Sequence, residues 1–509
     1  MFDIFLVRGN HPTTRGHQDS QGLTAHTPCP AKKRTALQAR STTWLWTLAL
    51  LVVLVGCSNT TSSSHTSPAT STSTNRQSTP LSLPPQAVTP TSSAPTSADW
   101  TTYHNDNARA GYVANAPDPQ RLTRAWNVSM DGAVYSEPLV IGGHVLVATE
   151  NDSLYSLDAR TGKVLWRTNV GTPMPLSQLP CGNIDPLGIT GTPVYDPATN
   201  LVFAVAEISG PSHVLVGVDA STGRVRIRRL VEPLDGDIRA HQQRAALVLS
   251  QSLVYIAYGG LDGDCGNYHG WVIASRTDGQ GALLSYRLPT QREGGIWAAS
   301  GPAADSAGHI YVAVGNGAAT GGTWDKTDSV LRLSPALQYE DGFAPQQWAQ
   351  DNAGDADLGS MGPLLLPGGL VFADGKSGLG YLLHANALGG IDGQAQVASI
   401  CSSYGGSAAL GTHLFVPCTD GLREAVVGPG TRLTLGWHAP GQINGSPIVV
   451  GHTVFSLKRN GTLYALNSDN GVVIASQFVG ETSRFATPSY SGGHVYVGTL
   501  RGIVAVTIA

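Results

Sequence analysis

The sequence predicts an all-β fold, a β-propeller of about eight four-stranded antiparallel blades. The 509 residues include 61 Gly and 31 Pro but only 13% charged residues, a balance typical of short strands joined by tight turns. A short phrase that usually ends in Pro recurs along the chain. Each copy precedes a run of apolar residues that has the length of a strand.

The recurring phrase marks the start of each unit. Eight copies begin about 40 to 60 residues apart, the spacing expected for propeller blades. They lie at residues 136–138, 191–193, 244–246, 300–302, 361–363, 406–408, 445–447 and 486–488. The copies at 244–246 and 406–408 have diverged and lack the final Pro, so seven blades is the alternative count.

Each unit reads as a meander of about four short strands, as in HVLVAT from His144 followed by SLYSLD from Ser153. One such sheet has two apolar faces and cannot bury either alone, whereas a closed ring of sheets buries both. The last unit reaches Ala509 after only three strands. We therefore expect residues 122–128, LTRAWNV, to supply its outer strand and to close the ring near Trp126.

The N-terminal part reads as an export signal and a tether. A basic stretch at 32–34 precedes an apolar run at 44–56 that is short for a bilayer span. The letters LVGC, ending at Cys57, resemble a bacterial lipobox, whose cysteine carries the lipid; a plain membrane anchor is the alternative. Residues 1–57 are thus the expected signal peptide. Residues 58–98, rich in Ser, Thr and Pro, are the expected disordered tether, and 99–509 the propeller.

Four further cysteines predict two disulfides. Cys401 and Cys418 flank one strand-turn-strand segment, so we expect them to face each other, which leaves Cys181 to pair with Cys265. Both bonds suit an oxidising compartment outside the cytoplasm. No CxxC or zinc-type spacing is present.

Charge and motifs exclude several functions. A net charge of −4 argues against nucleic-acid binding. The alternating arginines at 224–229 read as a charged outer strand, with an anionic partner as the alternative. GxSxG, HExxH and GxGxxG are absent, and DGKS at 374–377 reads as a turn.

Polar and aromatic residues gather in the third and fourth units. Because inner strands of a propeller begin near its axis, we expect His241, Arg244 and Trp297 to approach that axis and form a ligand pocket. The alternative is a set of turn residues around a water-filled channel.

The segment LYSLDARTGKVLW at 154–166 is similar to the repeat of the pyrroloquinoline quinone (PQQ)-binding-like β-propellers, within the quinoprotein alcohol dehydrogenase-like superfamily. The resemblance covers roughly residues 100–509 and is most specific in the first two and last two units. It implies a tryptophan that docks one blade on the next. By this match the docking position is filled by Trp126, Trp166, Trp348 and Trp437, and by Ile227 and Ala475 in two other units.

A second segment, GGIWAASGPAADSAGHIYVAVGNG at 294–317, resembles the part of quinoprotein alcohol dehydrogenases that holds the cofactor. The resemblance implies Trp297 as a floor beneath the quinone, Asn316 as a calcium ligand and Asp357 as a calcium ligand and catalytic base. Asp264 is the carboxylate that lies nearest in the sequence to the position of the glutamate that is a further calcium ligand in that family. The chain departs from that family because it has no adjacent cysteine pair, no long inserted loops and no haem-attachment motif.

We thus carry two hypotheses. The first is a non-catalytic binding or scaffolding lipoprotein at the extracytoplasmic face of a membrane. We expect it to be monomeric, to use no cofactor, and to have envelope proteins or cell-wall glycans as partners. The alternative is a PQQ- and calcium-dependent dehydrogenase of alcohols or sugars.

Overall fold

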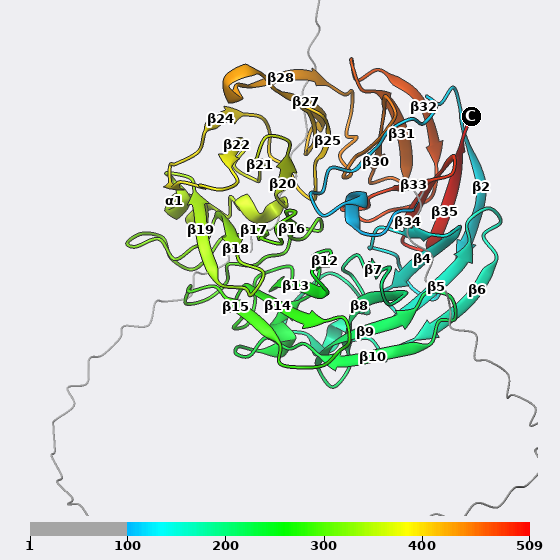
Figure 1. Ribbon diagram of the computed structural model, residues 1–509, viewed down its shortest axis with the longest axis horizontal. Helices are drawn as coiled ribbons and strands as arrows, with labels where there is room; N and C mark the ends of the chain where they lie inside the picture. Colours follow the sequence, from blue (N-terminus) through cyan, green and yellow to red (C-terminus); the bar gives the residue numbers. More distant parts are fainter. Residues whose placement is uncertain (1–98) are drawn as a thin grey trace, which may run out of the picture. The chain divides into compact units, whose positions relative to one another are not determined.

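The computed structural model of the chain describes residues 99–509, which form a ring of eight β-sheets (Figure 1). The lipobox Cys57, the signal peptide and the tether at 58–98 lie outside the described residues. In each blade the first strand is innermost and the fourth lies on the rim (Figure 1). The predicted count of eight is confirmed, including the two blades with diverged start phrases.

The first four blades follow one another along the chain. Blade 1 contains β3 (Leu139–Ile141), β4 (His144–Thr149), β5 (Ser153–Asp158) and β6 (Val164–Asn169); blade 2 contains β7 (Val194–Asp196), β8 (Leu201–Ile208), β9 (Ser212–Asp219) and β10 (Val225–Leu230). Blade 3 contains β11 (His241–Gln242), β12 (Val248–Ser250), β13 (Leu253–Gly260), β14 (Trp271–Arg276) and β15 (Leu284–Arg287). Blade 4 contains β16 (Ala303–Ala304), β17 (Ile310–Val314), β18 (Ser329–Leu333) and β19 (Tyr339–Ala344), with β23 (Gly390–Ile391) added in parallel to β19.

The remaining blades complete the ring. Blade 5 contains β20 (Leu364–Leu366), β21 (Leu370–Ala373), β22 (Leu379–His384) and β24 (Gln396–Ser399); blade 6 contains β25 (Ala408–Leu410), β26 (His413–Cys418), β27 (Gly421–Val427) and β28 (Leu433–His438). Blade 7 contains β29 (Ile448–Val450), β30 (Thr453–Lys458), β31 (Thr462–Asn467) and β32 (Val473–Phe478), with β1 (Tyr112–Val113) parallel to β29. Blade 8 contains β33 (Ser489–Ser491), β34 (His494–Thr499), β35 (Gly502–Ile508) and β2 (Leu122–Ser129).

Short helical segments join the strands. One α-helix, α1 (Trp348–Gly354), follows blade 4. The 3-10 turns are η1 (Tyr103–Asn105), η2 (Leu176–Gln178), η3 (Ile238–Ala240), η4 (Leu358–Ser360) and η5 (Pro429–Thr431). Among residues 99–509 no helix has the length and apolarity needed to cross a bilayer.

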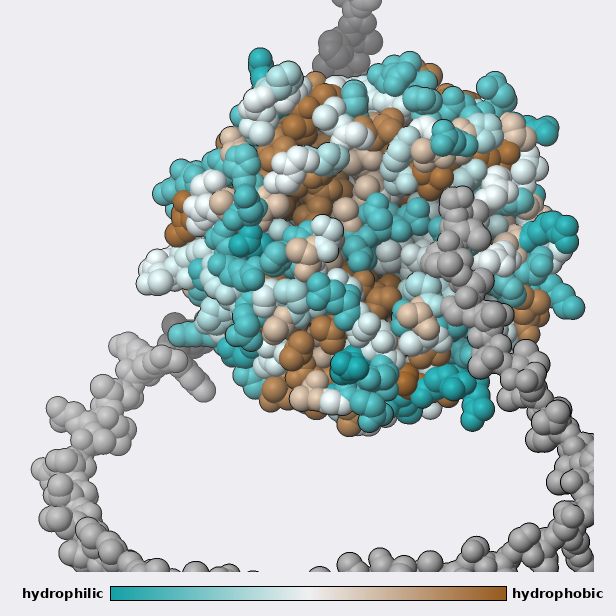
Figure 2. Space-filling model, in the orientation of Figure 1, coloured by the Kyte–Doolittle hydropathy of each residue, from teal (hydrophilic) through white to brown (hydrophobic). Residues whose placement is uncertain are grey.

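Burial follows the position of a strand in its blade. Strand β4, in the interior of blade 1, is buried at all but its first residue, whereas the rim strand β6 alternates between exposed and half-buried residues. Interior strands therefore pack on both neighbouring sheets, as the closed ring requires. On the face that Figure 2 shows, exposed apolar residues are dispersed among polar ones.

The ring closes as predicted. Strand β2 pairs antiparallel with β35, from Leu122 opposite Ile508 to Ser129 opposite Gly502. The indole of Trp126 then crosses to blade 1, where its Nε1 donates to the carbonyl oxygen of Ala159 at 3.1 Å.

The docking tryptophans repeat this contact. Trp166 donates to the Ala220 oxygen at 2.9 Å and Trp437 to the Ser468 oxygen at 2.8 Å. Each ring lies against a turn glycine of the next blade. At Gly162, φ is +72° and a Cβ would lie 2.7 Å from Trp126, so only glycine fits beneath the ring.

Trp348 does not belong to this set. It is the first residue of α1 and is buried there, after the rim strand of blade 4 has ended. Ile227 does take the docking place in blade 2, because a Cβ on Gly279 of blade 3 would lie 2.9 Å from its Cγ2.

The segment before β1 runs around the inside of the ring, a feature that the sequence did not suggest. Residues 100–111 hydrogen-bond to one inner strand after another, and in each strand to the equivalent residue. These residues are Val140, Tyr195, Leu249, Ala304, Leu365, Ala409 and Val449, in blades 1 to 7.

Arg109 anchors this segment at the axis. It is 1% exposed, and its Nε donates to the Pro302 oxygen at 2.8 Å while Nη2 donates to the Leu247 oxygen at 3.1 Å. Its remaining partners are the Thr102 hydroxyl and the Tyr103 carbonyl, each at 3.0 Å. A buried guanidinium is thus satisfied largely by backbone oxygens, which fixes the segment to blades 3 and 4.

Candidate functional site

A cavity of about 610 Å³ lies within the ring. Its wall comes mostly from residues just before each blade start and from loops that follow inner strands. The polar and aromatic residues that line it include Tyr103, Tyr135, Thr190, Thr192, Arg244, Asp262, Asp264, Trp297, Asn316, Asp355, Asp357, Lys376, Tyr404, Arg459, Thr482, Ser483, Arg484, Phe485 and Thr487. A cavity of this volume encloses a ligand of drug or oligosaccharide size.

The segment inside the ring supplies part of the cavity wall. The hydroxyl of Tyr103 lies 3.1 Å from that of Thr487, and Glu137 accepts from the Trp100 indole and the His104 amide, each at 2.9 Å. Burial raises the pKa of Glu137 well above its ordinary value. Each of its oxygens accepts from the segment inside the ring, so Glu137 ties that segment to blade 1.

Three aromatic rings form the apolar part of the cavity. The Trp297 ring lies 6.4 Å from Tyr404 and 6.3 Å from Phe485, centroid to centroid. Trp297 itself is set among glycines: a Cβ on Gly259 would lie 2.8 Å from its Cβ, and one on Gly315 would lie 2.9 Å from its Nε1. The glycines therefore let the indole reach the cavity between blades 3 and 4.

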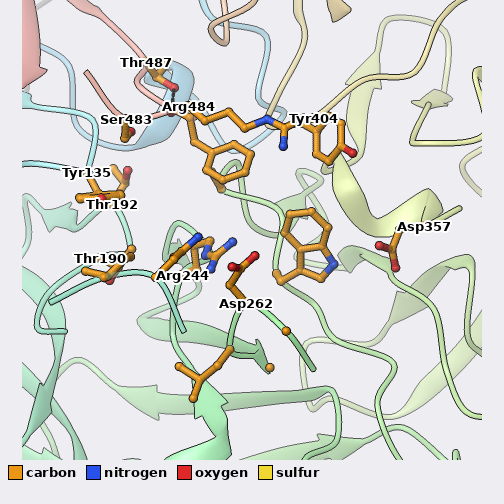
Figure 3. Close-up of a pocket in the computed structure, with 18 of the residues that line it drawn as sticks. Tyr135, Thr190, Thr192, Arg244, Asp262, Asp357, Tyr404, Ser483, Arg484 and Thr487 are labelled. Carbon is orange, nitrogen blue, oxygen red and sulfur yellow. Dashed lines mark hydrogen bonds between the residues drawn. The ribbon is translucent and has the colours of Figure 1, made fainter. Parts of the chain in front are cut away.

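Cationic groups flank these rings. The Arg484 guanidinium carbon lies 3.6 Å above Tyr404, and that of Arg244 lies 5.8 Å from Trp297. Figure 3 shows Arg484 reaching over Tyr404, with Arg244 and Asp262 below it. Such stacking places planar guanidinium groups beside the cavity without occupying it.

One side of the cavity carries an ion-pair cluster that runs from the buried Asp357 to the exposed Asp355. Asp357, 1% exposed, accepts from the backbone N–H of Asn316 through Oδ1 and pairs with Lys376 through Oδ2. Lys376 Nζ also lies 2.5 Å from Asp355 Oδ1. Burial alone would lower the pKa of Lys376, but the two carboxylates outweigh burial and raise it to about 12.

The opposite side is lined by hydroxyl groups. Figure 3 shows Tyr135, Thr190, Thr192 and Ser483 across the cavity from Tyr404 and Asp357. The hydroxyls of Thr482 and Ser483 are buried and have no hydrogen-bond partner within the described part of the chain. Unpaired buried hydroxyls are rare, so these two groups are hydrogen-bonding groups of the cavity wall whose capacity the described residues do not use.

Two disulfides hold the loops around the cavity. Cys181 pairs with Cys265 and Cys401 with Cys418, as predicted, with Cα–Cα distances of 6.1 and 5.6 Å. The first joins the loop before blade 2 to the 260–270 loop of blade 3, next to Asp264. The second fixes the segment that carries Tyr404.

The sequence-predicted site residues mostly come together. Arg244, Trp297, Asn316, Asp264 and Asp357 all line the cavity.

His241 does not line the cavity, although we expected it near the axis. Along the extended segment 241–244 side chains alternate, so Gln242 and Arg244 share one side, where Arg244 Nη2 donates to Gln242 Oε1 at 2.8 Å. The His241 ring points the other way. Its Nδ1 lies 2.9 Å from the Asp237 oxygen, and its Nε2 accepts from the His269 amide at 3.3 Å.

Several cavity residues escaped the sequence analysis, among them Lys376, Tyr404 and Arg484. Lys376 belongs to the DGKS segment, which is a turn as predicted but turns its lysine toward Asp357. Tyr404 and Arg484 could have been found from the sequence, because each lies within four residues before a repeated start phrase. The cavity residues Tyr135, Trp297 and Phe485 have the same position.

The donor set does not fit a calcium ion. Lys376 already places a positive charge between Asp355 and Asp357, and Asp264 Oδ1 accepts from the Tyr268 hydroxyl at 2.5 Å. Within residues 99–509 no three His, Cys, Asp or Glu side chains are arranged to hold a metal. A divalent ion would have to displace the ammonium group of Lys376.

Comparisons with known proteins place the fold. Residues 116–263 match the family described as outer membrane protein assembly factor BamB, a PQQ-type repeat family. No curated protein matches the sequence.

Solved structures match over most of the chain. Quinohemoprotein alcohol dehydrogenase ADHIIG from Pseudomonas putida HK5 is 12% identical with a TM-score of 0.62, covering 81% of this chain and 80% of that one. A europium-containing methanol dehydrogenase is 13% identical with a TM-score of 0.61, covering 81% and 98%. BamB from Moraxella catarrhalis is 14% identical with a TM-score of 0.53, covering 76% and 100%. The chain therefore has the PQQ-like β-propeller fold, which both kinds of protein share.

Proposed function

We propose that this PQQ-like β-propeller is an exported lipoprotein, anchored through Cys57, that acts as a non-catalytic binding module in the cell envelope. Its ligand enters the cavity inside the ring, and its loops contact envelope proteins or cell-wall glycans. The proposal concerns binding because the chemistry of the cavity wall favours recognition over reaction.

The state of Asp357 carries this proposal. A general base must present a free oxygen to the proton that it removes. Here one oxygen accepts a backbone amide and the other pairs with Lys376. Asp357 is therefore committed to an ion pair that would have to open before it could take a proton from a substrate, whereas Arg244, Arg459 and Arg484 have no ion pair within residues 99–509.

Three observations support the envelope location. The two disulfides are typical of proteins in oxidising compartments outside the cytoplasm. The lipobox-like LVGC and the Ser/Thr/Pro-rich stretch after it suit a tethered exported protein. The repeat family that matches residues 116–263 is named for an assembly factor of an outer membrane.

The test is whether the purified protein takes up PQQ and calcium. We expect no shift of the quinone spectrum and no reduction of an electron-accepting dye with alcohols or aldoses. Stoichiometric uptake of the quinone with dye reduction, both lost in Asn316→Ala, would overturn the proposal.

That outcome would support the second candidate, a quinoprotein dehydrogenase. It is favoured by one observation: Trp297, Asn316 and Asp357 line the same cavity. PQQ would supply the oxidant in such an enzyme. The fold alone does not favour it, because the same fold serves both kinds of relative.

A further inference from the structure

We propose that the cavity binds a carboxylate-bearing sugar, a short acidic oligosaccharide. This inference rests on the proposed binding function and names its ligand class. It combines three features of the cavity wall: unpaired guanidinium groups, unpartnered hydroxyls and aromatic faces.

The guanidinium groups in the cavity wall favour an anionic ligand. Arg244 makes one side-chain hydrogen bond, to Gln242, although a guanidinium has five donors. Arg459 and Arg484 have no ion pair within the described residues, and both line the cavity. A carboxylate matches the planar fork of a guanidinium, so Arg244, between the two sides of the cavity, is its expected partner.

The hydroxyl groups of Thr482 and Ser483 favour a ligand that carries hydroxyl groups. Thr482 and Ser483 are 3% and 7% exposed, and their oxygens lack partners within residues 99–509. Groups of this kind both donate and accept, which suits a polyol. Asp262 and Asp264 also line the cavity and can accept from sugar hydroxyls, while they disfavour a ligand with several phosphates.

The aromatic residues call for a ring with an apolar face. Trp297, Tyr404 and Phe485 stand together with centroid distances near 6 Å. The C–H face of a pyranose packs on such rings, while its hydroxyls and carboxylate reach the polar groups around them. A cavity of about 610 Å³ holds more than one sugar ring.

Carboxylated sugars come from two sources, uronic-acid polysaccharides and muramic-acid glycans of the cell wall. The experiment therefore titrates the full-length protein with a digalacturonate and with a muramic-acid disaccharide, by calorimetry. The uncharged controls are the methyl-esterified digalacturonate and a neutral disaccharide. The tighter of the two acidic ligands identifies the source.

We expect at least one acidic disaccharide to bind and its uncharged counterpart to bind about 10- to 100-fold more weakly, the effect of losing a charge-assisted hydrogen bond. Arg244→Gln should weaken the acidic ligand by a similar factor, and Ser483→Ala by about fivefold. Arg226→Gln, an exposed arginine on β10, is the matched control and should leave binding unchanged.

Three results would overturn the inference. They are equal binding of acidic and neutral sugars, tighter binding of a sugar phosphate than of either uronate or muramate, and no binding of any acidic sugar at millimolar concentration. None of these results touches the proposed binding function, which fails only if the quinone binds and supports dye reduction.

Discussion

The ring has a regular half and an irregular half. In blades 7, 8, 1 and 2 the strands follow the repeat closely, and Trp126 and Trp166 lock blade to blade. In blades 3 to 6 the repeat is interrupted by α1 and by the added strands β11 and β23, whereas the strand added to the other half, β1, comes from the segment before the blades. Most charged and aromatic residues of the cavity come from the second half, including Arg244, Trp297, Asp357 and Lys376. The regular half holds the ring closed, and the departures from the repeat build the site.

The largest expected effect tests the regular half. Trp126→Ala removes the indole that covers Gly162 and joins blade 8 to blade 1. We expect the free energy of unfolding to fall by about 3 to 5 kcal/mol, as for other large-to-small changes of packed aromatic residues. Urea titration followed by circular dichroism measures it.

The control for this change is Leu165→Ala in the rim strand β6, where the side chain is 44% exposed. It should change the free energy of unfolding by no more than about 0.5 kcal/mol. If both variants unfold at the same urea concentration, the tryptophan dock does not hold the ring closed.

The next effect tests the irregular half. Lys376→Gln leaves Asp357 buried without its counter-ion. We expect a loss of about 2 to 4 kcal/mol at pH 8. Burial raises the pKa of Asp357, so without the ammonium this carboxyl can be protonated as the pH falls. The variant should therefore approach the stability of the parent near pH 4 and fall behind it as the pH rises.

Thermal unfolding at pH 4, 6 and 8 measures this loss. The double variant Lys376→Gln with Asp357→Asn should recover most of the stability at pH 8. A loss of the same size at every pH would show that Lys376 acts by packing and not by charge.

The smallest effect compares the halves directly. Asp152 in blade 1 and Asp328 in blade 4 occupy the same repeat position, just before the third strand, and both are fully buried. Burial raises the pKa of each to about 8, helped by neighbouring carboxylates. A raised pKa means that stability is complete below the unfolded value near 4 and is lost as the pH rises through about 8.

Asp152→Asn and Asp328→Asn should therefore stabilise the protein by about 1 to 2 kcal/mol at pH 8 and by much less at pH 4. Urea titration at both pH values measures this. Unequal gains would show that the two halves bury the same carboxyl differently, and a gain that does not depend on pH would contradict the explanation by charge.

The same contrast explains what the sequence could predict. The repeated start phrases and Trp126 were enough to predict eight blades and the closing strand, because packing between blades repeats. Trp348 was placed wrongly because α1 replaces the turn expected after the rim strand of blade 4. The cavity was predicted only in part, because side-chain direction depends on local alternation that puts His241 and Arg244 on opposite sides. The ion pair of Lys376 with Asp357 joins residues from different loops, so it could not be predicted from a local sequence pattern.

Residues 100–129 have a consequence for how the molecule assembles. They are synthesised before any complete blade. Their partners nevertheless include β29 of blade 7, which pairs with β1, and β35 of blade 8, which pairs with β2, and these strands are synthesised last. Strands β1 and β2 therefore gain their partners only when synthesis is nearly complete, although residues 100–107 contact blades 1 to 4. Contacts between such distant parts of a chain form slowly, so the pairing of β2 with β35 should be a late step in folding.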